Sequence, residues 1–190
     1  MANELTNAFK QISKAIEKAS IDVLNNAAIS GRTRFASDIR ESTGLPQSRV
    51  GSRMITFKAT LNDQRASVQI ANGVALNAKY FKPQAITVSG TDSRTGKTRN
   101  YTGVTIKIGN QARYVLPNAW LATVSNGEVI PLVRKGAARL PTRAVFLDVI
   151  TDAAKAARPA AQEVMRDSFE ALLPVQLQFF LSQANNIDVV

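Results

Sequence analysis

The chain of 190 residues contains no cysteine and no histidine. Without cysteine it has no disulfide and no thiolate chemistry, and a zinc site lacks its commonest ligand. Without histidine it lacks the side chain most used for acid–base catalysis near neutral pH. Catalysis by carboxylates or lysine is the remaining enzymatic alternative. We therefore expect a protein that is not an enzyme and that binds neither a cofactor nor a metal.

Aromatic residues make up only 6% of the chain, and no apolar run approaches the ~18 residues of a membrane-spanning helix. The N-terminal sequence lacks the uninterrupted apolar segment of a secretion signal. Hydrophobic residues at 45% and charged residues at 20% are typical of a globular protein. We expect a single domain over residues 1–190, made in the cytosol, with no membrane partner and no small-molecule substrate.

Positive charge is abundant and unevenly distributed. The net charge is +10, and residues 1–147 hold 21 Lys and Arg against 8 Asp and Glu. Residues 148–190 hold 3 against 6. A basic body with a mildly acidic end suits docking on a nucleic acid, or stacking of subunits through opposite charges. A solvated basic surface without a partner is the alternative.

The N-terminal segment, residues 1–54, is predicted to be helical. Its first apolar positions alternate between spacings of four and three residues, which is typical of a helix that packs on its own domain or on a neighbouring subunit: Leu5, Phe9, Ile12, Ile16, Ala19 and Val23. We expect this helix to end at about Asn25–Gly31. A second helix is predicted over about 32–42, with Thr43-Gly44 as its C-cap, and a short third helix from Pro46.

The middle segment, residues 55–147, changes to the alternating pattern of strands. The predicted strands are Ile55–Leu61, Ala66–Ile70, Ala85–Ser89, Tyr101–Ile108, Arg113–Leu116, Trp120–Val124 and Val129–Val133. Asn126-Gly127 favours a type I′ hairpin turn. Gly90–Asn100 has no apolar residue and is predicted to be a projecting hairpin tip. Short turns between consecutive strands predict a central antiparallel sheet or a small barrel.

The last segment, residues 148–190, returns to a helical pattern. Pro159 is expected to start, end or kink a helix, and Pro174 to split or bend the one that follows. The predicted fold class is therefore α+β, with N-terminal helices, a central antiparallel sheet or small barrel, and C-terminal helices packed on the sheet.

Two motifs were tested as sources of other functions. Ser89–Thr98 resembles a phosphate-binding loop, but five residues instead of four separate its glycines and a strand pattern follows it, so the hairpin interpretation is preferred. The stretch from Ala36 to Met54 resembles a helix-turn-helix, in which Arg49 and Arg53 would contact DNA. Arg40 stands where this motif normally has a small residue. A helix-turn-helix DNA-binding protein is kept as the alternative function.

Ten residues are candidates for an interface with another subunit or partner. They are the apolar residues of the first helix, the cations of the hairpin tip and the apolar end of the last helix: Leu5, Phe9, Ile12, Ile16, Arg94, Lys97, Arg99, Phe179, Phe180 and Leu181.

A family resemblance rests on the order of several short segments. The chain contains Asn25–Ser30 and Ile39–Gly44 in its helical N-terminus, and Ile130–Gly136 at the end of its strand-rich middle. Arg139–Thr142 follows, and the last helix carries Leu173–Leu177 and Leu181. In this order, length and basic charge the chain resembles the minor tail protein Z family of tailed bacteriophages, which are tail-completion proteins.

The resemblance implies a structural protein of the virion, made in the host cytoplasm. Such a protein forms a homo-oligomeric ring, a hexamer by analogy with phage tails, at the head-proximal end of the tail. It completes the tail and helps to join it to the head connector in the neck. The partners implied are other tail and neck proteins, with non-specific contact to genomic DNA.

Overall fold

The computed structural model describes residues 2–71, 75–91, 96–116, 118–134 and 142–185. Its elements are α1 (Ala2–Thr43), α2 (Gln47–Gly51), β1 (Met54–Phe57), β2 (Ser67–Ile70), β3 (Leu76–Asn77), the 3₁₀ helix η1 (Ala78–Phe81), β4 (Gln84–Thr91), β5 (Thr98–Ile106), β6 (Tyr114–Leu116), β7 (Ala119–Thr123), β8 (Val129–Arg134), β9 (Thr142–Ala144), β10 (Phe146–Leu147) and α3 (Ile150–Asn185).

The chain divides into two compact units. Unit 1 comprises residues 1–37, 51–71 and 156–190, and unit 2 comprises residues 38–50 and 72–155. Unit 1 therefore holds most of α1 and α3 together with the β1–β2 hairpin, whereas unit 2 holds the other strands. That the chain forms a single domain stays a prediction.

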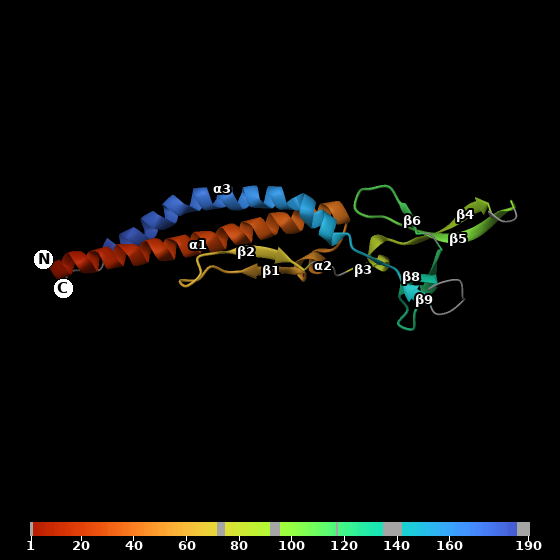
Figure 1. Cartoon of the computed structure of the whole chain (residues 1–190), viewed down its shortest axis with the longest axis horizontal. Helices are drawn as coiled ribbons and strands as arrows, with labels where there is room; N and C mark the ends of the chain where they lie inside the picture. Colours follow the sequence, from red (N-terminus) through yellow and green to blue (C-terminus); the bar gives the residue numbers. More distant parts are fainter. Residues whose placement is uncertain (1, 72–74, 92–95, 117, 135–141, 186–190) are drawn as a thin grey trace. The chain divides into compact units, whose positions relative to one another are not determined.

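In unit 1, α1 and α3 run side by side in opposite directions (Figure 1). The buried positions of α1 recur at every fourth residue, which forms one ridge along a helix: Ala15, Ala19, Val23, Ala27, Gly31 and Phe35. Most of these side chains are small, so the two helices can approach closely. On α3, Ala157 and Ala161 are also buried, and both are small as well. The partner of α3 in this unit is α1, and not the central sheet as the sequence predicted.

The prediction of two separate helices before residue 43 is wrong, because α1 is continuous. Gly31 lies inside it, where an added Cβ would be 2.1 Å from Cγ of Met165 and 3.3 Å from the carbonyl oxygen of Ala161. Asn25 also has a role other than a turn. Its Oδ1 accepts a hydrogen bond of 2.8 Å from the Ala59 amide, and its Nδ2 donates one of 3.3 Å to the Ala59 carbonyl. Asn25 thus anchors the chain beyond β1 to α1.

The C-terminal segment is likewise one helix. Pro159 and Pro174 both lie inside α3, and both are exposed. A proline inside a helix removes one backbone hydrogen bond and crowds the preceding turn. At an exposed position the carbonyl left without its donor is accessible to water, so the helix continues. Pro159 therefore neither starts nor ends a helix, and the predicted split at Pro174 is wrong, whereas a kink or bend at these residues stays a prediction.

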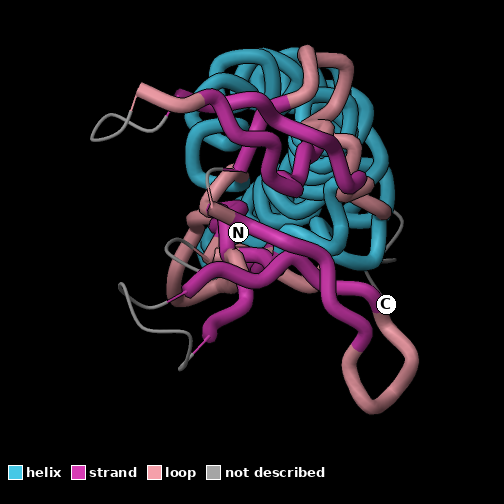
Figure 2. Tube along the Cα trace, turned by 90° about the vertical axis from the view of Figure 1, so that its right-hand side faces the viewer, coloured by secondary structure: helices cyan, strands magenta, loops and turns pink. Residues whose placement is uncertain are grey.

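Every one of the seven predicted strand segments overlaps a strand of the structure. The pairs β1–β2, β4–β5, β5–β6, β7–β8 and β8–β9 are antiparallel, and so is the pair β10–β3. The predicted hairpin is confirmed, with Thr91 opposite Thr98 as the last pair of β4 and β5. The strands of unit 2 form small sheets that are not closed into a barrel (Figure 2). The barrel alternative is therefore wrong.

The turn between β7 and β8 contains a glycine of positive φ. The Gly127 amide donates to the Val124 carbonyl at 2.8 Å, and Gly127 has a φ of 80°. Asn126 is not among the described residues of positive φ. This is a type I turn followed by a left-handed glycine, and not the predicted type I′ turn, which needs positive φ at both central residues.

The end of α1 depends on a second glycine. The predicted C-cap is confirmed, because α1 ends at Thr43 and Gly44, with a φ of 71°, donates to the Arg40 carbonyl at 2.8 Å. The Gly109 amide then donates to the Thr43 carbonyl at 2.9 Å. A Cβ on Gly109 would lie 2.1 Å from the Ser42 carbonyl oxygen, and its φ is 55°. Only glycine fits this position without a shift of the backbone.

We predict that Gly109→Ala destabilises the protein much more than Gly127→Ala. Both glycines have positive φ, which costs an alanine about 1–2 kcal/mol. Gly127 has no atom within 4 Å of an added Cβ, whereas Gly109 has the backbone of Ser42. Urea unfolding should show a loss of about 3 kcal/mol or more for Gly109→Ala. Equal losses at the two positions would contradict the close packing.

We also predict that Gly31→Ala destabilises unit 1 by about 1–3 kcal/mol, because Met165 must move. In a double-mutant cycle, Gly31→Ala combined with Met165→Ala should destabilise the protein by about 1 kcal/mol less than the sum of the two single substitutions. Gly51→Ala is the matched control, since nothing lies within 4 Å of its added Cβ. Additive effects of Gly31→Ala and Met165→Ala would show that the two residues do not touch.

Candidate assembly surfaces

The apolar residues predicted at the start of α1 are exposed. Phe9 is 70% exposed, Ile12 39% and Ile16 45%. Their spacings of three and four residues are the predicted ones. The residues of α1 that pack in unit 1 are, however, the mainly small ones that recur at every fourth position from Ala15. The side chain of Leu5 lies outside the described residues. The described residues therefore leave the part of the seam from Phe9 to Ile16 exposed, whereas Ala19 and Val23 of the same seam are buried.

The end of α3 exposes apolar residues as well. Phe179 is 51% exposed, and Phe180 and Leu181 are half-buried. The rings of Phe179 and Phe180 meet edge to face, with centroids 5.2 Å apart. Val175, which the sequence analysis did not select, is 60% exposed and lies one helical turn before Phe179.

The antiparallel course of the two helices brings these residues to one end of unit 1. The start of α1 and the end of α3 lie there together (Figure 1). Counting outward from the contact of Gly31 with Met165 places Ile16 near the level of Phe179, because both helices rise 1.5 Å per residue. We call Phe9, Ile12, Ile16, Val175 and Phe179 the helix-end surface. Exposed apolar residues gathered in this way are typical of protein–protein contact sites.

The cationic candidates of the β4–β5 hairpin belong to unit 2. Lys97 is exposed just before β5, and Arg99 lies in β5 opposite Gly90. The side chain of Arg99 and the whole of Arg94 lie outside the described residues.

The two candidate DNA-contact residues fall in different units. Arg49 is exposed in unit 2, with its guanidinium carbon 4.6 Å from the centre of the Tyr80 ring. Arg53 is half-buried in unit 1, where its carbonyl accepts the Ala71 amide. The helix α2, which contains Arg49, has only five residues. A helix of little more than one turn is a poor recognition element, because base contacts need several residues along a groove. The geometry therefore does not favour the helix-turn-helix alternative.

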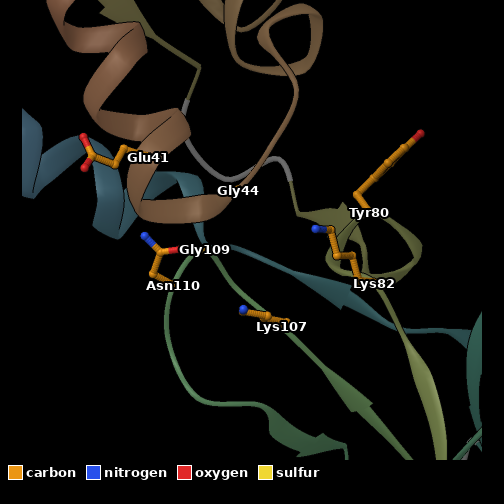
Figure 3. A pocket seen from close by; sticks show the side chains of 7 residues that line it. All are labelled: Glu41, Gly44, Tyr80, Lys82, Lys107, Gly109 and Asn110. Atoms are coloured by element: carbon orange, nitrogen blue, oxygen red, sulfur yellow. The ribbon is translucent and has the colours of Figure 1, made fainter.

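Unit 2 contains a polar pocket that the sequence analysis missed (Figure 3). Its volume is about 170 Å³, and it is lined by Glu41, Gly44, Tyr80, Lys82, Lys107, Gly109 and Asn110. The lining comes from the end of α1, from η1 and from the segment after β5. No motif joins these residues, since hydrogen bonds between distant segments bring them together, from Gly109 to Thr43 and from Lys107 to Phe81. Among the described residues no cluster of three or more metal-ligating side chains occurs.

An ion pair borders the same region. The Lys79 ammonium donates to the Glu128 carboxylate, and its nitrogen lies 5.2 Å from the centre of the Tyr80 ring. The hydrogen bond raises the pKa of Lys79 and lowers the pKa of Glu128, so each holds the other in its charged form. Tyr80 is thus contacted by Lys79 and by Arg49.

These features are those of a protein that contacts other macromolecules: an uncovered apolar surface in one unit and a basic pocket in the other. Within the described ranges, no helix is both long and apolar enough to cross a membrane. The sequence model of the prophage minor tail protein Z family matches residues 2–185. The chain belongs to this family and is a structural component of a bacteriophage tail. No curated protein and no solved structure matches the chain.

We predict that Phe9→Ser leaves the free energy of unfolding within about 0.5 kcal/mol of the wild-type value, because this side chain is already in water. Val23→Ser should lose about 3 kcal/mol, since Val23 is fully buried. Urea unfolding at low protein concentration measures both. A large loss for Phe9→Ser would mean that the helix-end surface is part of the core.

Proposed function

We propose that the protein completes the phage tail as a ring of identical copies at its head-proximal end, in the neck. There it helps to join the tail to the head connector. A hexamer is proposed by analogy with phage tails. The role is structural and not enzymatic, and its other partners are neighbouring tail and neck proteins.

The observation that carries this proposal is the helix-end surface. A closed ring needs a heterologous contact, in which one patch of a subunit meets a different patch of the next. The helix-end surface supplies such patches on two helices, with Phe9 and Ile16 from α1 and Phe179 from α3. Aromatic side chains of this kind supply much of the binding energy at protein interfaces. Covering them in a ring removes from water the apolar area that unit 1 leaves exposed.

Genomic DNA is proposed as a second, non-specific partner. Unit 2 has 14 Lys and Arg against 6 Asp and Glu, whereas unit 1 has 10 against 8. Most of the net charge of +10 thus belongs to unit 2. Contact with phosphates needs positive charge and no base reading, so no sequence preference is expected.

We predict that native mass spectrometry of the purified protein shows a closed oligomer, and that Phe9→Ser with Ile16→Ser reduces it to the monomer. A loss of about 2 kcal/mol at each apolar contact would weaken the association between copies by more than tenfold. Phage carrying the double substitution should produce tails that fail to join heads, as counted by electron microscopy.

Thr33→Ser is the matched control, because it changes an exposed α1 residue of unit 1 outside the helix-end surface. It should leave the oligomer intact. A wild-type protein that stays monomeric at every concentration and is never found in virions would overturn the proposed function.

A further inference from the structure

The polar pocket of unit 2 holds two lysines whose amines have no ion-pair partner among the described residues. Lys82 and Lys107 are both exposed, and Asn110, also exposed, contributes an amide to the same lining (Figure 3). Glu41 is the one carboxylate of the lining, and its oxygens point away from the two amines (Figure 3). The chemistry of the pocket therefore suits an anion.

Lys82 is fixed in a backbone conformation that lysine rarely adopts. Its φ is 48° and its ψ is 61°, in the left-handed region, where a side chain other than glycine is strained by about 1–3 kcal/mol. Arg113 holds it there, because Nη1 and Nη2 donate to the Lys82 carbonyl at 3.0 and 3.1 Å. Strain that is maintained by a dedicated bidentate contact is typical of functional positions.

Lys107 is placed by the backbone of the same region. Its amide donates to the Phe81 carbonyl at 2.7 Å, which ties the residue after β5 to the end of η1. Phe81 is 1% exposed, so this hydrogen bond ties Lys107 to a residue of the core. Both amines are therefore presented from fixed backbone positions, and only their side chains need to order when an anion binds.

Besides Glu41 in the lining, three carboxylates of unit 2 are engaged by groups outside the pocket. Glu128 is engaged by Lys79, Asp152 lies 3.6 Å from Lys155, and Asp148 accepts hydrogen bonds from Thr151 at the start of α3. The excess of positive charge in unit 2 is therefore available to an external polyanion.

We propose that Lys82, Lys107 and Asn110 form a phosphate-binding site for the backbone of double-stranded DNA. The inference rests on the proposed contact with genomic DNA and assigns it to a place. Two lysines contact adjacent phosphate oxygens as point charges, and the Asn110 amide adds a neutral hydrogen bond. The site reads no bases.

The test is a fluorescence-anisotropy titration of a labelled DNA duplex of mixed sequence with the full-length protein, at salt concentrations from about 50 to 200 mM. Lys82→Gln with Lys107→Gln should bind about tenfold more weakly and reduce the slope of log K against log salt by about 2. Lys14→Gln with Lys18→Gln removes the same charge from exposed positions of α1 and should change affinity less than about twofold.

Lys82→Gly is a second variant that guards against misfolding. Glycine accepts the left-handed conformation, so this change removes the amine while relieving the strain. This variant should be at least as stable as the wild type. Its slope of log K against log salt should still be smaller by about one.

The possible outcomes separate the two proposals. If the wild type binds DNA but the pocket and α1 double variants lose equal affinity, the site is elsewhere and DNA contact stands. If the wild type does not bind at the lowest salt, both fail, whereas the ring is judged separately by native mass spectrometry. Equal affinity for poly-L-glutamate, lost in the same pocket variant, would overturn the DNA assignment in favour of an acidic protein surface.

Discussion

The close packing of α1 on α3 is the constraint on which unit 1 depends. At Gly31 there is no room for a Cβ beside Met165, and the buried ridge of α1 consists mainly of small side chains. Small residues allow the two backbones to approach, and this leaves the larger apolar residues outside the contact. The exposure of Phe9, Ile16 and Phe179 is therefore a consequence of how the helices pack, and not an isolated surface property.

The two units differ in chemistry as well as in secondary structure. Unit 1 is nearly balanced in charge and exposes apolar side chains, whereas unit 2 is strongly basic and carries a polar pocket. Such a division suits a structural component of a phage tail whose proposed partners are other proteins and DNA. It also allows the assembly and the DNA proposals to be tested by changes in separate parts of the chain.

The sequence predicted the strands well, because alternation and turn residues are local signals. It also located the C-cap at Gly44. It failed where long-range contacts override local propensity: Gly31 and Asn25 were interpreted as helix breakers, but each is held by a distant segment. The polar pocket was not predictable, since the contact of Gly109 with Thr43 brings its lining together and no spacing in the sequence records that contact.

The prolines of α3 make the two long helices of the chain, α1 and α3, differ in stiffness. Pro159 and Pro174 each remove a donor from the hydrogen-bond ladder of α3, whereas α1 has an unbroken ladder over its 42 residues and contains no proline. α3 is therefore the more compliant helix and α1 the stiffer one. A subunit built in this way can adjust its curvature to its neighbours by bending α3, while α1 keeps the spacing along its length constant.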